Sequence, residues 1–182
     1  MANNCQNYIE ITGNKSQLKE LAKDLELDSK SGCDTGYDIY ENLRHKYKKN
    51  LGDDARWFDI DADIQKDNIS ISGDSAWCPC LELFTEISKV FPKLKIKYNY
   101  EEMGCDFSGW ADIENGNCND NCFKYWKGII IREGEDDALD LVLAFELECY
   151  ESEEELIESD MYLAFTKESQ EKILESFKGV LS

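Results

Sequence analysis

Residues 58–72 read FDIDADIQKDNISIS, two alternating segments on either side of a short polar turn. Apolar residues at positions 58, 60, 62 and 64 alternate with aspartates, which is the period of a strand buried on one face. Asp67 and Asn68 then form a turn, after which isoleucines alternate with serines over residues 69–72. The stretch therefore predicts a β-hairpin with one apolar and one polar face.

The residues before this hairpin predict a strand and then a helix. Residues 8–11 have the composition of a strand, and Asn14 followed by Gln17 is typical of a helix N-terminus. The apolar face of that helix is formed by Leu18, Leu21, Ala22 and Leu25. Residues 28–54 have no clear period, and we expect a long connection there with one helical stretch.

The residues after the hairpin predict a second helix and two strands. Pro79 suits the first turn of a helix, and residues 93–100 alternate as a strand. Residues 107–114 form a further predicted strand, which ends at Asn115-Gly116. The order βαββαβ plus one strand predicts an α+β protein, with a ferredoxin-like split βαβ sheet over residues 1–116.

Residues 117–182 predict an acidic, mainly helical C-terminal extension. Within it, residues 124–132 suggest a strand and residues 136–150 a helix. Ser152 with Glu155 forms a capping box that begins a short helix, and a last helix is expected near the C-terminus. The sequence leaves open whether this extension packs on the sheet.

Acidic side chains dominate the composition. The chain has 39 Asp and Glu residues against 20 Lys and Arg, which gives a formal net charge of −19. Residues 1–116 carry −8 and the shorter segment 117–182 carries −11. Such a field repels nucleic acid and anionic lipid, so we expect neither as a direct ligand. No apolar run reaches the roughly 20 residues of a membrane helix and no signal peptide is evident, so we expect a cytoplasmic protein.

Six short motifs along residues 1–116 have the order and spacing of a known family. They are Asn3-x-Cys5-x-Asn7 followed by Gly13, Arg56-Trp57-Phe58-Asp59, Ser75-Ala76-Trp77-x-Pro79, Phe91-Pro92-x-Leu94, Tyr100-Glu101-Glu102-x-Gly104 and Phe107-x-Gly109. In these motifs the chain resembles the YubB-like ferredoxin-like domain proteins of bacterial plasmids and phages, most of which have no assigned function. It departs from them at Asn4, where they usually have Trp, and at Cys78 and Cys80. The resemblance implies the fold and no activity.

The expected topology places these motifs along one edge of the sheet. In a βαββαβ sheet, the first two strands start at the edge where the next two strands end. The candidate partner-binding residues at that edge are Asn4, Arg56, Trp57, Asp74, Trp77, Glu101 and Glu102. On a functional interpretation, exposed indole rings and carboxylates there bind a protein. On a structural interpretation, Trp57 and Trp77 fill the bottom of the core, and Asp74 or Ser75 caps the next helix.

A second candidate surface lies in the acidic extension. Thirteen carboxylates occur from Glu133 to Asp160 with no lysine or arginine between them. The candidate partner-binding residues there are Glu151, Glu153, Glu154, Glu155 and Glu158. Such a helical surface would imitate a phosphate track and occupy the basic groove of a nucleic-acid-binding protein. The alternative interpretation is a solvated face that keeps the protein soluble.

The sequence thus predicts a non-enzymatic protein-binding module of a phage or plasmid, with no catalytic residues and no cofactor. His45 is the only histidine, and no phosphate-binding glycine loop is present. The alternative is a small metal- or ligand-binding domain that uses cysteine thiols or the Trp57/Trp77 edge. The candidate metal ligands are Cys78, Cys80, Cys118 and Cys122, although their spacing differs from the usual paired knuckles of zinc sites.

Overall fold

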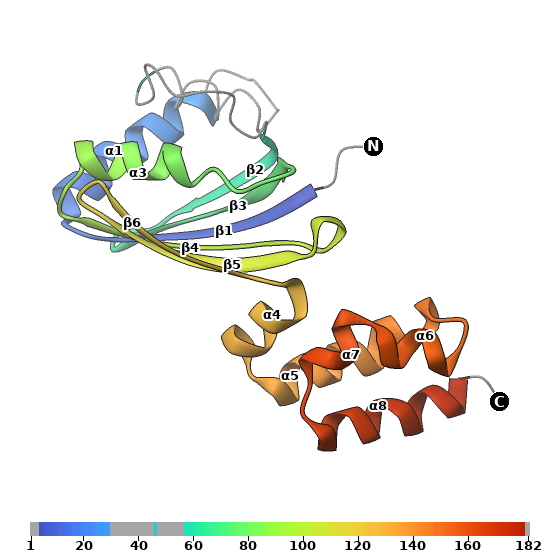
Figure 1. The fold of residues 1–182 in the computed structure, drawn as a ribbon. Coiled ribbons are helices and arrows are strands. Elements are labelled where there is room, and N and C mark those ends of the chain that lie inside the picture. Colours follow the sequence, from blue (N-terminus) through green and yellow to red (C-terminus); the bar gives the residue numbers. More distant parts are fainter. Residues whose placement is uncertain (1–3, 30–45, 47–56, 181–182) are drawn as a thin grey trace. The chain divides into compact units, whose positions relative to one another are not determined.

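A six-stranded sheet with the order β2-β3-β1-β4-β5-β6 forms the N-terminal part of the computed structural model (Figure 1). The structure describes residues 4–29, 46 and 57–180. The strands are β1 (Asn4–Gly13), β2 (Trp57–Ile64), β3 (Asn68–Ala76), β4 (Leu94–Glu102), β5 (Phe107–Glu114) and β6 (Asn117–Phe123). β1 runs antiparallel to both β3 and β4, β2 to β3, and β5 to β4. This is the predicted ferredoxin-like arrangement, with β5 added beside β4 and β6 added beside β5.

Helices α1 (Lys15–Ser29) and α3 (Leu81–Val90) cover one face of this sheet (Figure 1). Every second residue of the central strands points toward the two helices, as the strand period requires. Ile11 of β1, Ile69 of β3 and Leu94 of β4 are fully buried in the resulting core. The predicted helix start is confirmed, because Asn14 Oδ1 accepts hydrogen bonds from the backbone N–H groups of the first turn of α1.

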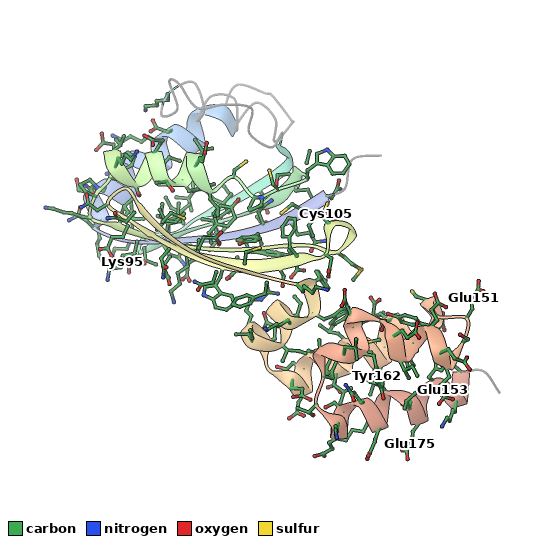
Figure 2. All side chains as sticks on the ribbon, in the orientation of Figure 1. Lys95, Cys105, Glu151, Glu153, Tyr162 and Glu175 are labelled. Carbon is green, nitrogen blue, oxygen red and sulfur yellow. The ribbon has the colours of Figure 1, made fainter. Side chains whose placement is uncertain are left out.

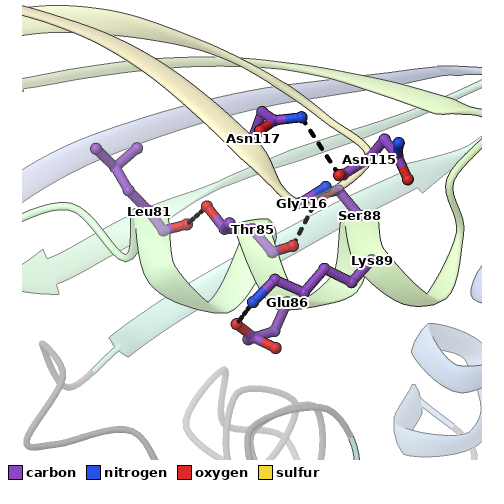
Figure 3. A network of polar contacts seen from close by, with 8 residues as sticks. All are labelled: Leu81, Thr85, Glu86, Ser88, Lys89, Asn115, Gly116 and Asn117. Atoms are coloured by element: carbon purple, nitrogen blue, oxygen red, sulfur yellow. Dashed lines mark hydrogen bonds and ion pairs between the residues drawn. The ribbon is translucent and has the colours of Figure 1, made fainter.

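A tight turn joins β5 to β6 and rests on α3 (Figure 3). Asn115 and Gly116 both have positive φ, 50° and 77°, as a type I′ hairpin turn requires. The N–H of Gly116 donates to Ser88 Oγ at 2.8 Å, and Ser88 Oγ donates to the carbonyl of Thr85 at 2.7 Å. Strand β6 is a correction to the sequence analysis, which assigned residues 117–123 to the extension.

Tyr100 of β4 reaches across β5 to β6. Its hydroxyl donates to Asp120 Oδ1 at 2.6 Å, and the side chain passes directly over Gly109 of β5. A Cβ atom at Gly109 would lie 2.5 Å from the Tyr100 hydroxyl oxygen and 2.4 Å from the carbonyl oxygen of Asn121. Only glycine at this position leaves room for the tyrosine to pin the outer strand.

The chain divides into two units, residues 1–121 and residues 122–182. The second unit is helical, as the sequence predicts. It contains α4 (Tyr125–Glu133), α5 (Glu135–Leu141), a π-helical turn (Val142–Glu146), a 3-10 turn (Leu147–Cys149), α6 (Glu153–Glu158), α7 (Asp160–Ala164) and α8 (Lys167–Val180). Its core is formed by Ile129, Ala138, Leu139, Val142, Leu147, Leu156, Met161, Phe165, Ile173 and Phe177. In the part of the chain that the structure describes, no helix has the length and apolar composition of a membrane span.

The predicted strand over residues 124–132 is wrong, because these residues form α4. Three consecutive isoleucines at 129–131 favour a strand by propensity. Helical spacing instead lets Tyr125 and Ile129 share one side of the helix and pack in the core of the second unit. Tertiary packing of this apolar face therefore overrides the local preference.

Polar contacts fix several helix ends in the second unit. The predicted capping box is present, since Ser152 Oγ accepts from the N–H of Glu155, and Glu155 Oε2 accepts from the N–H of Glu151. Glu135 joins the start of α5 to the start of α8, because its Oε1 atom accepts from Ser169 Oγ at 2.6 Å and from the N–H of Thr166 at 3.0 Å. These hydrogen bonds lower the pKa of the Glu135 carboxyl, and the bond from Ser169 has the largest effect.

Replacement of Gly109 by alanine is expected to destabilise the sheet by about 2–3 kcal/mol, because the added methyl group overpacks the site under Tyr100. Urea unfolding followed through the amide signals of β4 and β5 measures this. Gly179→Ala is the matched control: no atom lies within 4 Å of its Cβ position, and the helix end should be unchanged or slightly more stable. A loss below about 0.5 kcal/mol for Gly109→Ala would contradict the steric role of this glycine.

Candidate functional site

The strand register brings the sequence motifs together at one edge of the sheet. Asn4 pairs with Ala76, Gln6 pairs with both Asp74 and Glu101, and Trp57 pairs with Ser75. The starts of β1 and β2 therefore lie beside the ends of β3 and β4, as expected. We call the surface formed by Asn4, Asp74, Trp77, Glu101 and Met103 the Trp77 edge. Arg56 and His45 lie outside the described residues, and Trp57 is placed by its backbone alone.

Trp77 stands on a strained turn directly after β3. Its φ angle is 71°, and the N–H of Cys78 donates to the carbonyl of Ala76 at 2.9 Å, which forms a γ-turn of the rarer, positive-φ type. The side chain is 52% exposed. The structural interpretation, in which Trp77 fills the core, is therefore wrong for this residue. The predicted cap of the next helix is also wrong, because neither Asp74 nor Ser75 caps α3, which starts after Cys80 without a side-chain cap.

A buried polar network holds this turn in place. Asn7 Nδ2 lies 2.8–3.0 Å from three acceptors, the carbonyl oxygens of Cys5 and Gly73 and the hydroxyl oxygen of Ser75. Ser75 Oγ in turn donates to the carbonyl of Cys78 at 2.7 Å. The Tyr98 hydroxyl donates to Asn7 Oδ1 at 2.8 Å and accepts from the N–H of Cys80 at 3.0 Å. The network thus connects the residues before the Trp77 turn, Gly73 and Ser75, with the residues after it, Cys78 and Cys80.

Sequence reasoning did not single out Asn7, Ser75 and Tyr98 as a group. All three side chains are at most 1% exposed, although two of them are amide or hydroxyl residues of kinds that usually face solvent. The available signal was the polar residue at an inward-facing position of each strand, Asn7 in β1 and Ser75 in β3. Polar residues at inward-facing strand positions indicate a buried hydrogen-bond network, which in this protein holds the Trp77 turn.

The adjacent carboxylates Glu101 and Glu102 point to opposite faces, as the strand period predicts. Glu102 is 3% exposed, and its Oε1 atom accepts from the N–H of Gly104 at 2.8 Å. Its Oε2 atom is buried and has no hydrogen-bond partner among the described residues. The strand continues into a 3-10 turn (Met103–Cys105) whose methionine is exposed. Glu101 and Met103 therefore reach the outer surface of the Trp77 edge, whereas Glu102 does not.

The four candidate zinc ligands do not form one site. Cys118 and Cys122 are four residues apart on β6, which separates them by about 13 Å, whereas thiolates on one zinc ion lie roughly 4 Å apart. Cys80 is buried against the core and Cys78 is exposed. Within residues 4–29 and 57–180, no group of three or more His, Cys, Asp or Glu side chains is placed to hold a metal ion.

The carboxylates of the acidic candidate surface are all exposed. Figure 2 shows Glu151 and Glu153 on the outside of the helical unit. Glu153, Glu154 and Glu155 form the first turn of α6, where the helix dipole favours negative charge. Part of the acidic run thus stabilises its own helix, while Glu151 and Glu158 are exposed outside that first turn.

Replacement of Tyr98 by phenylalanine is expected to cost about 1–3 kcal/mol, because it leaves Asn7 Oδ1 and the N–H of Cys80 without their buried partner. Amide exchange at Cys80 should become faster as the Trp77 turn loosens. Tyr8→Phe is the control, since the Tyr8 hydroxyl is exposed and bonds only weakly to Gln6 at 3.3 Å. Equal stability and equal exchange in the two variants would argue against the network as the support of this turn.

The thiol of Cys5 is expected to resist alkylation in the folded protein. Burial raises its pKa to about 12, so at pH 8 only about one molecule in ten thousand carries the thiolate. Iodoacetamide labelling at pH 8, read by peptide mass spectrometry, should modify exposed Cys78 and Cys105 and spare Cys5 until urea is added. Because the pKa is raised from its usual 9.0, the fold should also lose stability as the pH rises from 9 toward 12. Native labelling of Cys5 at the rate of Cys78 would refute its burial.

Comparison with known proteins gives one match. The model of the family described as the ferredoxin-like domain in Api92-like protein matches residues 52–142, which is half of the chain. Neither the curated proteins nor the solved structures contain a match. The matched segment begins just before β2, spans the remaining strands with α3 between them, and ends in the helical unit. The chain therefore belongs to the family of ferredoxin-like domains of Api92-like proteins.

Proposed function

We propose that the chain is a non-enzymatic protein-binding module of a phage or plasmid, and that the Trp77 edge contacts its partner. The observation that carries this proposal is the exposed indole on a strained backbone. Strained backbone conformations persist where many contacts of the surrounding structure hold them in place, and they cluster at binding sites. Contact with a partner explains why a bulky side chain occupies a position whose φ angle favours glycine.

The composition of the Trp77 edge supports a protein as the ligand. Two apolar side chains, Trp77 and Met103, are each about half exposed. Asn4, Asp74 and Glu101 lie on the neighbouring strands β1, β3 and β4 at the same edge, and Asn4 Nδ2 donates to Asp74 Oδ2 at 3.3 Å. Aromatic and methionine anchors within a polar rim are typical of protein interfaces. The net charge of −19 disfavours nucleic acid as the ligand.

The acidic helical unit is a second candidate contact surface. Its sixteen carboxylates against six basic side chains over residues 122–182 give it a strongly negative field. Glu154 and Glu158 are exposed on α6, and Glu151 is exposed just before this helix. Such a surface suits the basic groove of a nucleic-acid-binding protein. The resemblance to plasmid and phage proteins supports a host or element-encoded protein as the partner.

Replacement of Trp77 by glycine separates the proposed role from a structural one without knowledge of the partner. Glycine relieves the positive-φ strain and adds freedom to the unfolded chain, so stability should be unchanged or up to about 1 kcal/mol higher. A tryptophan that supported the core would instead cost about 3–5 kcal/mol on removal. Urea unfolding of both proteins decides between the two roles.

The partner itself is captured by a photo-crosslinking amino acid, p-benzoylphenylalanine, placed at position 77 in cells. A discrete protein adduct is expected from position 77, and Trp77→Gly should then weaken binding of that purified protein at least tenfold. The same amino acid at position 8, where Tyr8 is also half exposed on the open face of the sheet, is the control. Equal adducts from both positions would exclude the Trp77 edge as the contact surface.

A further inference from the structure

The helix that runs from Glu135 to Cys149 has apolar residues on a buried side and also on an exposed side. It consists of α5, the π-helical turn and the 3-10 turn, which follow one another without a break. One side, with Ala138, Leu139 and Val142, is buried in the core of the second unit. The other side is exposed.

Leu141, Ala144 and Phe145 form the exposed side, which we call the apolar helix face. Their spacing of three and four residues places them together on one surface of a helix. Phe145 is 73% exposed and Leu141 is 44% exposed, and no other large apolar side chain among the described residues is as exposed as Phe145. A helix that is apolar on both sides normally has a packing partner on both sides. The π-helical turn that contains Ala144 and Phe145 is itself a feature often found at functional sites.

The charges around this face define what can cover it. Asp137, Asp140 and Glu148 are exposed on the same helix, and no lysine or arginine occurs from Glu133 to Thr166. A second copy of the chain would bring these carboxylates against identical ones, and each copy carries −19. A partner with basic residues beside an apolar stripe can bury the apolar side chains of this face and pair with its carboxylates at the same time.

We propose that the apolar helix face docks a cationic amphipathic helix of a partner protein. The apolar stripe of that helix packs on Leu141, Ala144 and Phe145, and its lysine or arginine side chains lie near Asp137, Asp140 and Glu148. The proposal deepens the protein-binding function, on which it rests, by naming the chemistry of the partner at a surface separate from the Trp77 edge. It also differs from a phosphate-track mimic, which needs carboxylates but no apolar face.

The test uses the full-length chain and two synthetic peptides of equal composition. One is a leucine–lysine helix with a single apolar stripe, and the other is a scrambled peptide that cannot form such a stripe. The amphipathic peptide is expected to bind at least tenfold more tightly by calorimetry and to shift the amide signals of residues 141–148. Phe145→Ser should weaken its binding about ten- to hundredfold, because one aromatic side chain is then no longer buried in the complex.

Matched variants separate the contribution of the apolar side chains to peptide binding from that of the carboxylates. Leu163→Ser, which removes a 62% exposed apolar side chain from α7, should leave peptide binding unchanged. Asp137→Asn with Asp140→Asn and Glu148→Gln should weaken binding and flatten its salt dependence. Both serine variants change exposed residues, so circular dichroism should confirm that their helices are intact.

Three results would overturn the proposal. Unchanged binding by Phe145→Ser would remove the apolar helix face as the site. Equal binding of the scrambled peptide would show that charge alone accounts for the binding, without any contribution from the apolar helix face. Sedimentation of the wild-type chain as a dimer and of Phe145→Ser as a monomer would identify a second copy as the occupant. Trp77→Gly should bind the peptide normally, so failure of the proposed Trp77 contact and failure of this one are distinguishable.

Discussion

Asn7 carries a neutral amide into the interior of the sheet, where each of its hydrogen-bonding atoms needs a partner. It finds them on three strands: its own β1, β3 through Gly73 and Ser75, and β4 through Tyr98. These contacts extend through Ser75 and Tyr98 to the backbone of Cys78 and Cys80, which directly follow Trp77. The position of the exposed Trp77 indole is thus determined by a residue that is itself buried. An apolar side chain at position 7 would pack in the core but would leave this turn unsupported.

The alternation of apolar and polar residues was sufficient to predict five of the six strands and their order βαββαβ plus one strand along the chain. The hairpin of residues 58–72, the start of α1 at Asn14 and the strands at 93–100 and 107–114 all depend on local periods and caps, which act within a few residues. Once the order βαββαβ was established, antiparallel pairing alone brought four distant motifs to one edge. The register of Gln6 with both Asp74 and Glu101 agrees with that expectation.

The features that sequence reasoning missed depend on contacts between elements. The segment Asn117–Phe123 is rich in residues that disfavour strands, and it forms β6 because the Asn115-Gly116 turn returns it along β5 and Tyr100 pins Asp120. Conversely, the isoleucines of α4 favour a strand locally but are needed in the core of the second unit. The orientation of Trp77 follows from a γ-turn held by a buried hydroxyl, which no local pattern encodes. The candidate edge and the place of Trp77 on it were therefore predictable, whereas the sequence left open whether this indole is exposed or buried.

The two outermost strands that the structure describes, β2 and β6, carry aspartates and asparagines where other sheets expose apolar or hydroxyl residues. Unpaired strand edges are templates on which further chains assemble into fibrils, and charge with poor strand propensity at the edge is the usual protection. The same protection acts on any incoming peptide that would extend the sheet through its backbone. The proposed recognition of a partner therefore uses side chains, and high local concentration should not drive the sheet toward amyloid.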